Sequence, residues 1–265
     1  MLCVCSIVLA HQSFDALPVV VAANRDERLD REATPPRAWP AEPFVAPRDE
    51  VAGGTWLGLT RGGLFVGVTN RFAVPKDERR ASRGVLVVEA LRAKDAASLR
   101  ASLEGLAPER YNAFHLLYAD ARDAFVTWSD GAAIAHQRLA PGVHVVTERS
   151  FRDARSPHPP ERFGVHFGDD RAREARLRAA MDALLASAAA PTVEVLAAML
   201  QVHDEADPLG ATCIHLPALG YGTRSSLVLL GAERVADSRI HWAEGPPCVT
   251  PFVERRDLVA ALSEG

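Results

Sequence analysis

The sequence predicts an α+β fold, and in particular a four-layer αββα sandwich. Two runs of strand-like segments alternate along the chain with two groups of helical segments. Within each run the strands follow one another across short polar turns, which is typical of antiparallel sheets. Two sheets, each covered by one pair of helices, accommodate this order. We therefore expect a single domain over residues 1–265.

Composition narrows the class of protein. The 265 residues are 48% hydrophobic and 24% charged, which is ordinary for a soluble globular protein. A net charge of −4 offers no electrostatic attraction for nucleic acid or anionic membranes. No segment approaches the ~18 apolar residues of a membrane span, and the apolar run Leu2–Ala10 lacks the basic flank of a signal peptide. We expect a cytoplasmic protein with a small-molecule partner, no nucleic acid and no membrane insertion; its oligomeric state stays open.

The most informative stretch runs from residue 19 to residue 27. Val19–Ala23 reads as a buried strand, and it ends abruptly in four polar residues, Asn24, Arg25, Asp26 and Glu27. These residues form either a solvated strand end with a local ion pair or a polar cluster that faces a pocket.

The other strands of the first run follow from patterning. Leu2–Ala10 reads as the first strand, and Glu32–Arg48, with five prolines, as an extended surface loop. The turn Gly53-Gly54 leads into a hairpin over residues 55–60 and 64–70, which carries Trp56 and ends at Asn70.

The rest of the chain supplies the helices and the second run of strands. Apolar periodicity predicts four helices: one around residues 86–91, then 95–106, 171–188 and a segment that follows the cap Thr192. Further strands are expected at residues 113–119, 124–128, 143–147, 211–216, 225–230 and 235–242.

Four cysteines, Cys3, Cys5, Cys213 and Cys248, are too few and too scattered for a disulfide framework. Cys3 and Cys5 share one face if they lie on a strand. They are either two small buried hydrophobes or include a reactive thiol near the N-terminus. No cysteine or histidine at ligand spacing follows them nearby, so we expect no metal site.

Several motifs together resemble the NRDE family, also called the transport and Golgi organisation 2 family. The tetrapeptide 24–27 is the family signature, and the other motifs follow in family order. They are Gly53-Gly54-Thr55-Trp56-Leu57-Gly58, Val68-Thr69-Asn70, Ser82-Arg83-Gly84, Tyr111-Asn112-Ala113-Phe114 and Gly220-Tyr221-Gly222-Thr223-Arg224.

The resemblance implies an N-terminal-nucleophile hydrolase fold, related to penicillin V acylase and bile salt hydrolase. Carried over to this chain, it implies Cys5 as nucleophile, Arg25 and Asp26 as its orienting pair, Asn70 near the oxyanion and Arg224 closing the pocket. The nucleophile in that group has a free α-amine. A start at Val4 is one hypothesis for exposing Cys5, and which of Cys3 and Cys5 is reactive stays open.

Two functions from different classes follow from the resemblance. The first is a carrier that binds or traffics a hydrophobic anionic ligand such as haem or an acyl-coenzyme A, with no cofactor required. Its ligand-binding residues would be Asn24, Arg25, Glu27, Trp56 and Arg224.

The alternative function is a cysteine-dependent amidohydrolase acting on a non-peptide C–N bond. Glu148 stands where the family's oxyanion Asn is expected, and a carboxylate there repels a developing oxyanion, which favours the carrier. His11, His115 and His144 share no spacing, so the sequence assigns no haem ligand. A third interpretation is a scaffold whose strand-end polar residues satisfy one another.

Overall fold

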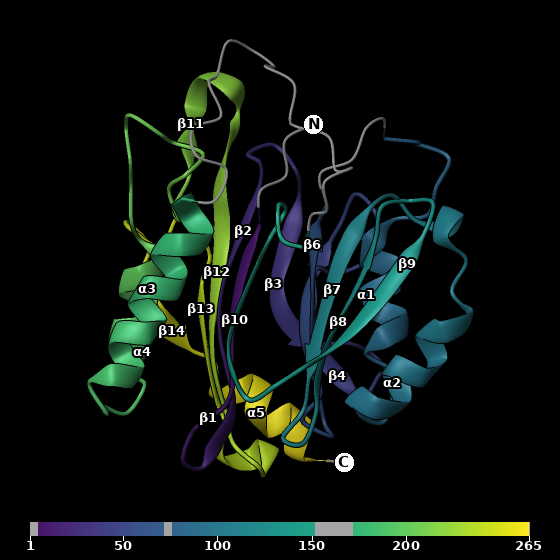
Figure 1. The fold of residues 1–265 in the computed structure, drawn as a ribbon, viewed down its shortest axis with the longest axis horizontal. Coiled ribbons are helices and arrows are strands. Elements are labelled where there is room, and N and C mark those ends of the chain that lie inside the picture. Colours follow the sequence, from purple (N-terminus) through teal and green to yellow (C-terminus); the bar gives the residue numbers. More distant parts are fainter. Residues whose placement is uncertain (1–4, 72–75, 152–171, 265) are drawn as a thin grey trace.

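The computed structural model describes residues 5–71, 76–151 and 172–264. Their strands form two seven-stranded antiparallel sheets that face each other, with helices on both outer sides (Figure 1). Apolar side chains of both sheets fill the space between them. A second apolar cluster lies between one sheet and helices α1 (Arg83–Ala90) and α2 (Ala96–Ser102), and a third between the other sheet and helices α3 (Ala172–Ala186) and α4 (Val193–Leu200). The predicted αββα sandwich is confirmed.

Sheet A has the order β10-β1-β2-β12-β13-β14, and the short strand β11 pairs with β12. Its strands are β1 (Ser6–Phe14), β2 (Leu17–Arg28), β10 (Gly142–Thr147), β11 (His215–Leu216), β12 (Tyr221–Gly231), β13 (Arg239–Ala243) and β14 (Val253–Glu254).

Sheet B runs in chain order from β3 to β9. Its strands are β3 (Ala33–Ala38), β4 (Phe44–Asp49), β5 (Leu57–Thr60), β6 (Phe65–Asn70), β7 (Phe114–Ala119), β8 (Ala124–Ser129) and β9 (Ile134–Leu139).

Five α-helices are present in the described part of the chain: α1 (Arg83–Ala90), α2 (Ala96–Ser102), α3 (Ala172–Ala186), α4 (Val193–Leu200) and α5 (Arg256–Ser263). The helix cap predicted at Thr192 is confirmed, because its side chain accepts a hydrogen bond from the Val195 amide. Helix α5 lies between the two sheets at the lower end of the molecule in Figure 1, and it contributes Leu258 and Leu262 to the inter-sheet core. None of the described helices has the length and apolar character needed to span a bilayer.

The expectation of a surface loop over residues 32–48 is wrong, because this stretch contains β3 and β4. Pro35 and Pro36 fall between Thr34 and Arg37, where the pairing of β3 with β4 shifts register. A missing N–H costs little at a bulge, and β3 is also the edge strand of sheet B. The proline pattern therefore marked an irregular edge strand.

Four other segments differ from the expectation. Strand β9 and helix α5 were not predicted; β9 is half polar because it is the opposite edge of sheet B. Residues 211–214 form loop rather than strand, and only His215–Leu216 pair with β12. Residues 235–237 form a 3₁₀ turn that precedes β13. Cys3 and the proposed start at Val4 lie outside the described residues.

Two of the motifs that carried the resemblance lie against each other. Gly54 packs directly on Gly84, where a Cβ on Gly54 would lie 2.3 Å from the Gly84 carbonyl carbon. The Thr55 amide donates a hydrogen bond of 3.2 Å to the Gly84 carbonyl. The glycines therefore let the start of α1 approach the loop that leads to Trp56.

Candidate functional site

Strand ends from both sheets converge at one end of the sandwich, the upper end in Figure 1, where β1 begins. Strand β1 begins there, and Ser6 pairs with Asn24 of β2 on one side and Thr147 of β10 on the other. Strand β12 reaches the same end, with Thr223 opposite Asp26. Strand β6 of sheet B joins them, because the Thr69 hydroxyl donates to the Thr147 carbonyl at 3.5 Å.

Alternation along the strands divides these residues between the two faces of sheet A. Ile7 and Ala23 point into the inter-sheet core, so Cys5 and Arg25 lie on that face as well. Asn24 and Asp26 lie on the opposite face, toward helices α3 and α4. The structure therefore separates the predicted pair Arg25 and Asp26 across the sheet.

Cys5 is a buried free thiol directly before β1. Its Sγ donates to the backbone carbonyl of Asp26 across 3.8 Å. The link between these two residues thus runs through the backbone of β2, and the Asp26 carboxylate faces the other way. The thiol therefore lies buried on the inter-sheet face of sheet A, directly before β1.

Arg25 is held on the inter-sheet face by two interactions. Its guanidinium stacks over the Trp56 ring, 4.1 Å from the centroid, and its Nη2 lies 3.2 Å from the Asp49 carboxylate. Asp49 also pairs with Arg31 at 2.7 Å, so two guanidinium groups share one carboxylate. Trp242 lies beside Trp56, with ring centroids 6.2 Å apart. The result is a fixed positive charge against an aromatic surface.

Asp26 is fully buried and interacts with groups behind the sheet. The Thr223 hydroxyl donates to one of its oxygens at 2.5 Å, and Arg173 of α3 lies 3.5 Å from the other. Burial raises the pKa of this carboxyl to about 7; Arg173 and Thr223 oppose the shift, while the charge of Glu148 adds to it.

Asn24 has partners within the protein for its whole side chain. Its amide nitrogen donates to the carbonyls of Leu200 at 3.0 Å and Thr212 at 2.7 Å, and its oxygen accepts from Ser226 at 2.6 Å. The residue therefore ties the end of α4 and the following loop to sheet A, on the face away from Cys5.

The remaining predicted residues lie near the strand ends. Arg224 sits at a register shift between β12 and β2, and its guanidinium donates to the Leu29 carbonyl. Glu27 is buried, accepts from the Arg28 amide at 2.9 Å and lies 3.7 Å from Arg31. Asn70 is the half-buried last residue of β6. Of these three, Asn70 is the one whose strand touches β10 beside Cys5.

Glu148 follows β10 directly and lies 3.3 Å from Arg149. This ion pair partly offsets the negative charge of Glu148, the residue that stands where the resemblance implies an oxyanion Asn. The second carboxylate oxygen of Glu148 is buried and has no hydrogen-bond partner among the described residues.

The three histidines considered as haem ligands are engaged in hydrogen bonds. His115 is buried between Thr69, 3.1 Å from Nδ1, and the Ser150 carbonyl, 2.7 Å from Nε2. Burial and then the charge of Arg71 lower the pKa of His115 to about 3. The Nε2 atoms of His11 and His144 lie 3.0 and 2.8 Å from backbone carbonyls.

Sequence reasoning missed several residues of this region. Ser225 is opposite Arg25 in the β2–β12 register, and its buried hydroxyl lacks a hydrogen-bond partner within the described chain. Thr223 and Arg173 hold Asp26. The motif 220–224 contained Thr223, and Ser225 follows it directly, but the register shift between Thr223 and Ser225 has no signature in the sequence.

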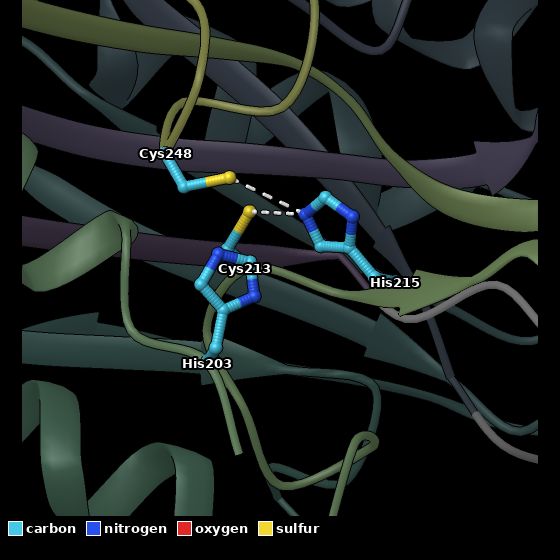
Figure 2. Close-up of side chains that lie close together, drawn as sticks. All are labelled: His203, Cys213, His215 and Cys248. Carbon is cyan, nitrogen blue, oxygen red and sulfur yellow. Dashed lines mark hydrogen bonds between the residues drawn. The ribbon is translucent and has the colours of Figure 1, made fainter. Parts of the chain in front are cut away.

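The structure also gathers four side chains that the sequence did not connect, at the loops beside β11. They are His203, Cys213, His215 and Cys248 (Figure 2). The pair Cys213-x-His215 was a local signal, but the other two members come from distant segments.

Comparison with known proteins gives two results. The model of the family described as transport and Golgi organisation 2 matches residues 2–244. Among solved structures, a mutant conjugated bile acid hydrolase from Clostridium perfringens aligns with a TM-score of 0.57 at 10% identity, covering 96% of this chain and 93% of that one. Another variant of that hydrolase aligns at 0.54 and 9% identity, covering 91% and 89%. The comparison with curated proteins gave no match. At these identities the likeness shows the fold.

Proposed function

We propose that this chain, which belongs to the transport and Golgi organisation 2 family, is a hydrolase. It would cleave a non-peptide amide of a small molecule, with Cys5 as the nucleophile. The observation that carries the proposal is the position of the Cys5 thiol. It precedes the first strand of an αββα sandwich similar in fold to a bile acid hydrolase, on the face that also carries Arg25.

The chemistry needs a base, a nucleophile and stabilisation of an oxyanion. The Cys5 sulfur attacks the amide carbonyl, its proton passes to the leaving amine, and the C–N bond breaks to leave a thioester. Water then attacks the thioester and releases the acid. The base would be the α-amine of Cys5, which requires that residues 1–4 be absent from the active chain.

The surrounding residues suit this reaction. Arg25 offers a fixed positive charge on the same face, and the Ser225 hydroxyl is a donor without a partner in the described structure. Asn70, the last residue of β6, is the side-chain amide that would donate a hydrogen bond to the oxyanion. The ion pair between Glu148 and Arg149 reduces the repulsion that an isolated carboxylate would exert on the oxyanion.

The experiment compares the chain of residues 1–265 with a chain whose first residue is Cys5. Each is incubated with a panel of N-acyl amides, and the acyl-enzyme thioester is sought by intact mass. We expect turnover and a thioester only with Cys5 first, and a loss of at least about 1,000-fold in Cys5→Ala. Ser13→Ala, at the far end of β1, is the matched control. Equal turnover by Cys5→Ala would refute the assignment.

A second candidate is a carrier for a hydrophobic anion such as haem or an acyl-coenzyme A. The stack of Arg25 on Trp56, with Trp242 beside it, favours it, because a cation on an aromatic surface suits an anionic group attached to an apolar body. Titration with haemin and with an acyl-coenzyme A tests it. Saturable binding lost in Arg25→Ala, with no turnover of any amide, would favour the carrier over the hydrolase.

We also propose a cytoplasmic location. The cysteines of the described chain, Cys5, Cys213 and Cys248, are free thiols, which suits a reducing compartment.

A further inference from the structure

We propose that His203, Cys213, His215 and Cys248 form a structural zinc site. One ligand atom from each residue lies within 4.8 Å of every other. Figure 2 shows both sulfur atoms directed at the imidazole of His215. This site is separate from Cys5 and does not depend on the function proposed above.

The distances fit tetrahedral coordination. The Sγ atoms of Cys213 and Cys248 each lie 3.4 Å from Nε2 of His215. Zinc bonds of about 2.3 Å to sulfur and about 2.0 Å to nitrogen, at a tetrahedral angle, separate sulfur from nitrogen by about 3.5 Å. The His203 ring lies against that of His215, with centroids 4.5 Å apart. A single ion can thus reach all four ligand atoms with small side-chain adjustments.

The donor set also selects the metal. Two thiolates and two neutral imidazoles balance the charge of a divalent ion and leave no open coordination position, as in structural zinc sites. Soft sulfur ligands disfavour magnesium and calcium, which prefer oxygen. Without an ion, both thiols point at the same nitrogen, which accepts only one good hydrogen bond.

The backbone holds the ligands in place from three segments of the chain. The Cys213 amide donates to the Val202 carbonyl at 3.0 Å, which fixes the segment of His203 beside that of Cys213. The Gln201 side chain donates to the Pro247 carbonyl at 3.0 Å, which brings the segment of Cys248 to the same place. The site is therefore organised by contacts that involve none of its own side chains.

The four side chains of the cluster differ in how far they are buried. Cys213 is buried, Cys248 is half-buried, and His203 and His215 are exposed. An ion therefore has a path from solvent, while the buried thiolate gives it a bond shielded from water.

A bound zinc ion would stabilise the loop around Ile214, which contacts Asp26 through Thr223. Ile214, between two of the ligands, donates its amide to the Thr223 hydroxyl at 2.8 Å and accepts from the Thr223 amide at 2.9 Å. Thr223 in turn donates to Asp26. Zinc would thus fix the loop that orients this hydroxyl.

The first measurement is the metal content of the full chain, purified without a histidine tag. We expect about one zinc ion per chain. Replacement by Co²⁺ should give the visible bands of tetrahedral cobalt together with near-ultraviolet sulfur-to-metal charge transfer. This spectrum tests the site in the unmodified protein, whether or not any variant folds.

Variants then assign the ligands. Cys248→Ser and His203→Gln change accessible side chains, and each should weaken zinc affinity by at least about 100-fold while circular dichroism is unchanged. Cys5→Ser and His144→Gln are the matched controls, and both should keep the metal. A chelator should lower the melting temperature of the unmodified chain, and added zinc should restore it.

Three results would overturn the proposal. One is a chain that binds neither zinc nor cobalt. Another is a Cys213–Cys248 disulfide in the protein purified under native conditions, detected by peptide mass. The third is unchanged zinc content in both Cys248→Ser and His203→Gln.

Discussion

Replacing Asp26 with asparagine should remove a pH-dependent loss of stability that originates in one buried carboxyl. Burial raises the pKa of Asp26 from 3.8 to about 7 in the folded protein. Between about pH 4 and about pH 7 the folded state therefore keeps a proton that the unfolded state releases, so this group's contribution to stability falls as pH rises.

The magnitude follows from the two pKa values. The difference is 7 − 3.8, or 3.2 units. At 1.36 kcal/mol per unit, the contribution lost across this range is about 4 kcal/mol. Asparagine is neutral at every pH, and its carbonyl oxygen can accept the Thr223 hydroxyl as the carboxyl does. The unfolding free energy of the natural chain minus that of Asp26→Asn should therefore decrease by about 4 kcal/mol between about pH 4 and pH 8.

Urea unfolding followed by tryptophan fluorescence, with both proteins at each pH, measures this difference. The contributions of the other titrating groups to the unfolding free energy cancel in this difference, because both proteins contain those groups. A difference that stays constant with pH, or that rises with pH, would refute the reasoning. It would mean that Arg173 and Thr223 keep Asp26 ionised in spite of its burial.

The remaining predictions concern three other positions. The pKa of His115 is lowered to about 3, so the unfolded state takes up the proton first as pH falls. The protein should therefore lose about 5 kcal/mol of unfolding free energy between about pH 6.5 and about pH 3. In His115→Gln, urea unfolding should no longer show this contribution. Gly54→Ala should cost at least about 2 kcal/mol in urea unfolding, because its Cβ would meet the backbone of Gly84. Arg25→Ala should cost about 2 kcal/mol and alter the fluorescence of Trp56, since it removes a cation–π contact and a buried ion pair.

Each of these has a control or a contrary outcome. Gly105→Ala, where a new Cβ meets nothing within 4 Å, should change stability far less than Gly54→Ala. The slope for His115 has the opposite sign to that for Asp26, so a His115→Gln protein that still loses stability in acid like the natural chain contradicts the assignment. An Arg25→Ala protein with unchanged stability would show that Arg31 alone satisfies Asp49.

Much of the architecture follows from local patterning. Strand runs and helix groups in alternation predict the αββα layers, and the polar residues 24–27 after a buried strand allow the interpretation of a polar cluster that faces a pocket. The prediction of a loop over residues 32–48 was wrong because proline shows only that a backbone N–H donor is absent. An edge strand with a bulge tolerates that absence as well as a loop does.

The sequence by itself determined that a buried strand ends in the polar residues 24–27, and it left open whether they form a local ion pair or a cluster that faces a pocket. Only the tertiary structure decided which face meets the opposite sheet, and so separated Arg25 on Trp56 from Asp26 on Thr223. The gathering of His203, Cys213, His215 and Cys248 was likewise a tertiary outcome. Long-range packing brings those loops together, and no periodicity in the chain records it.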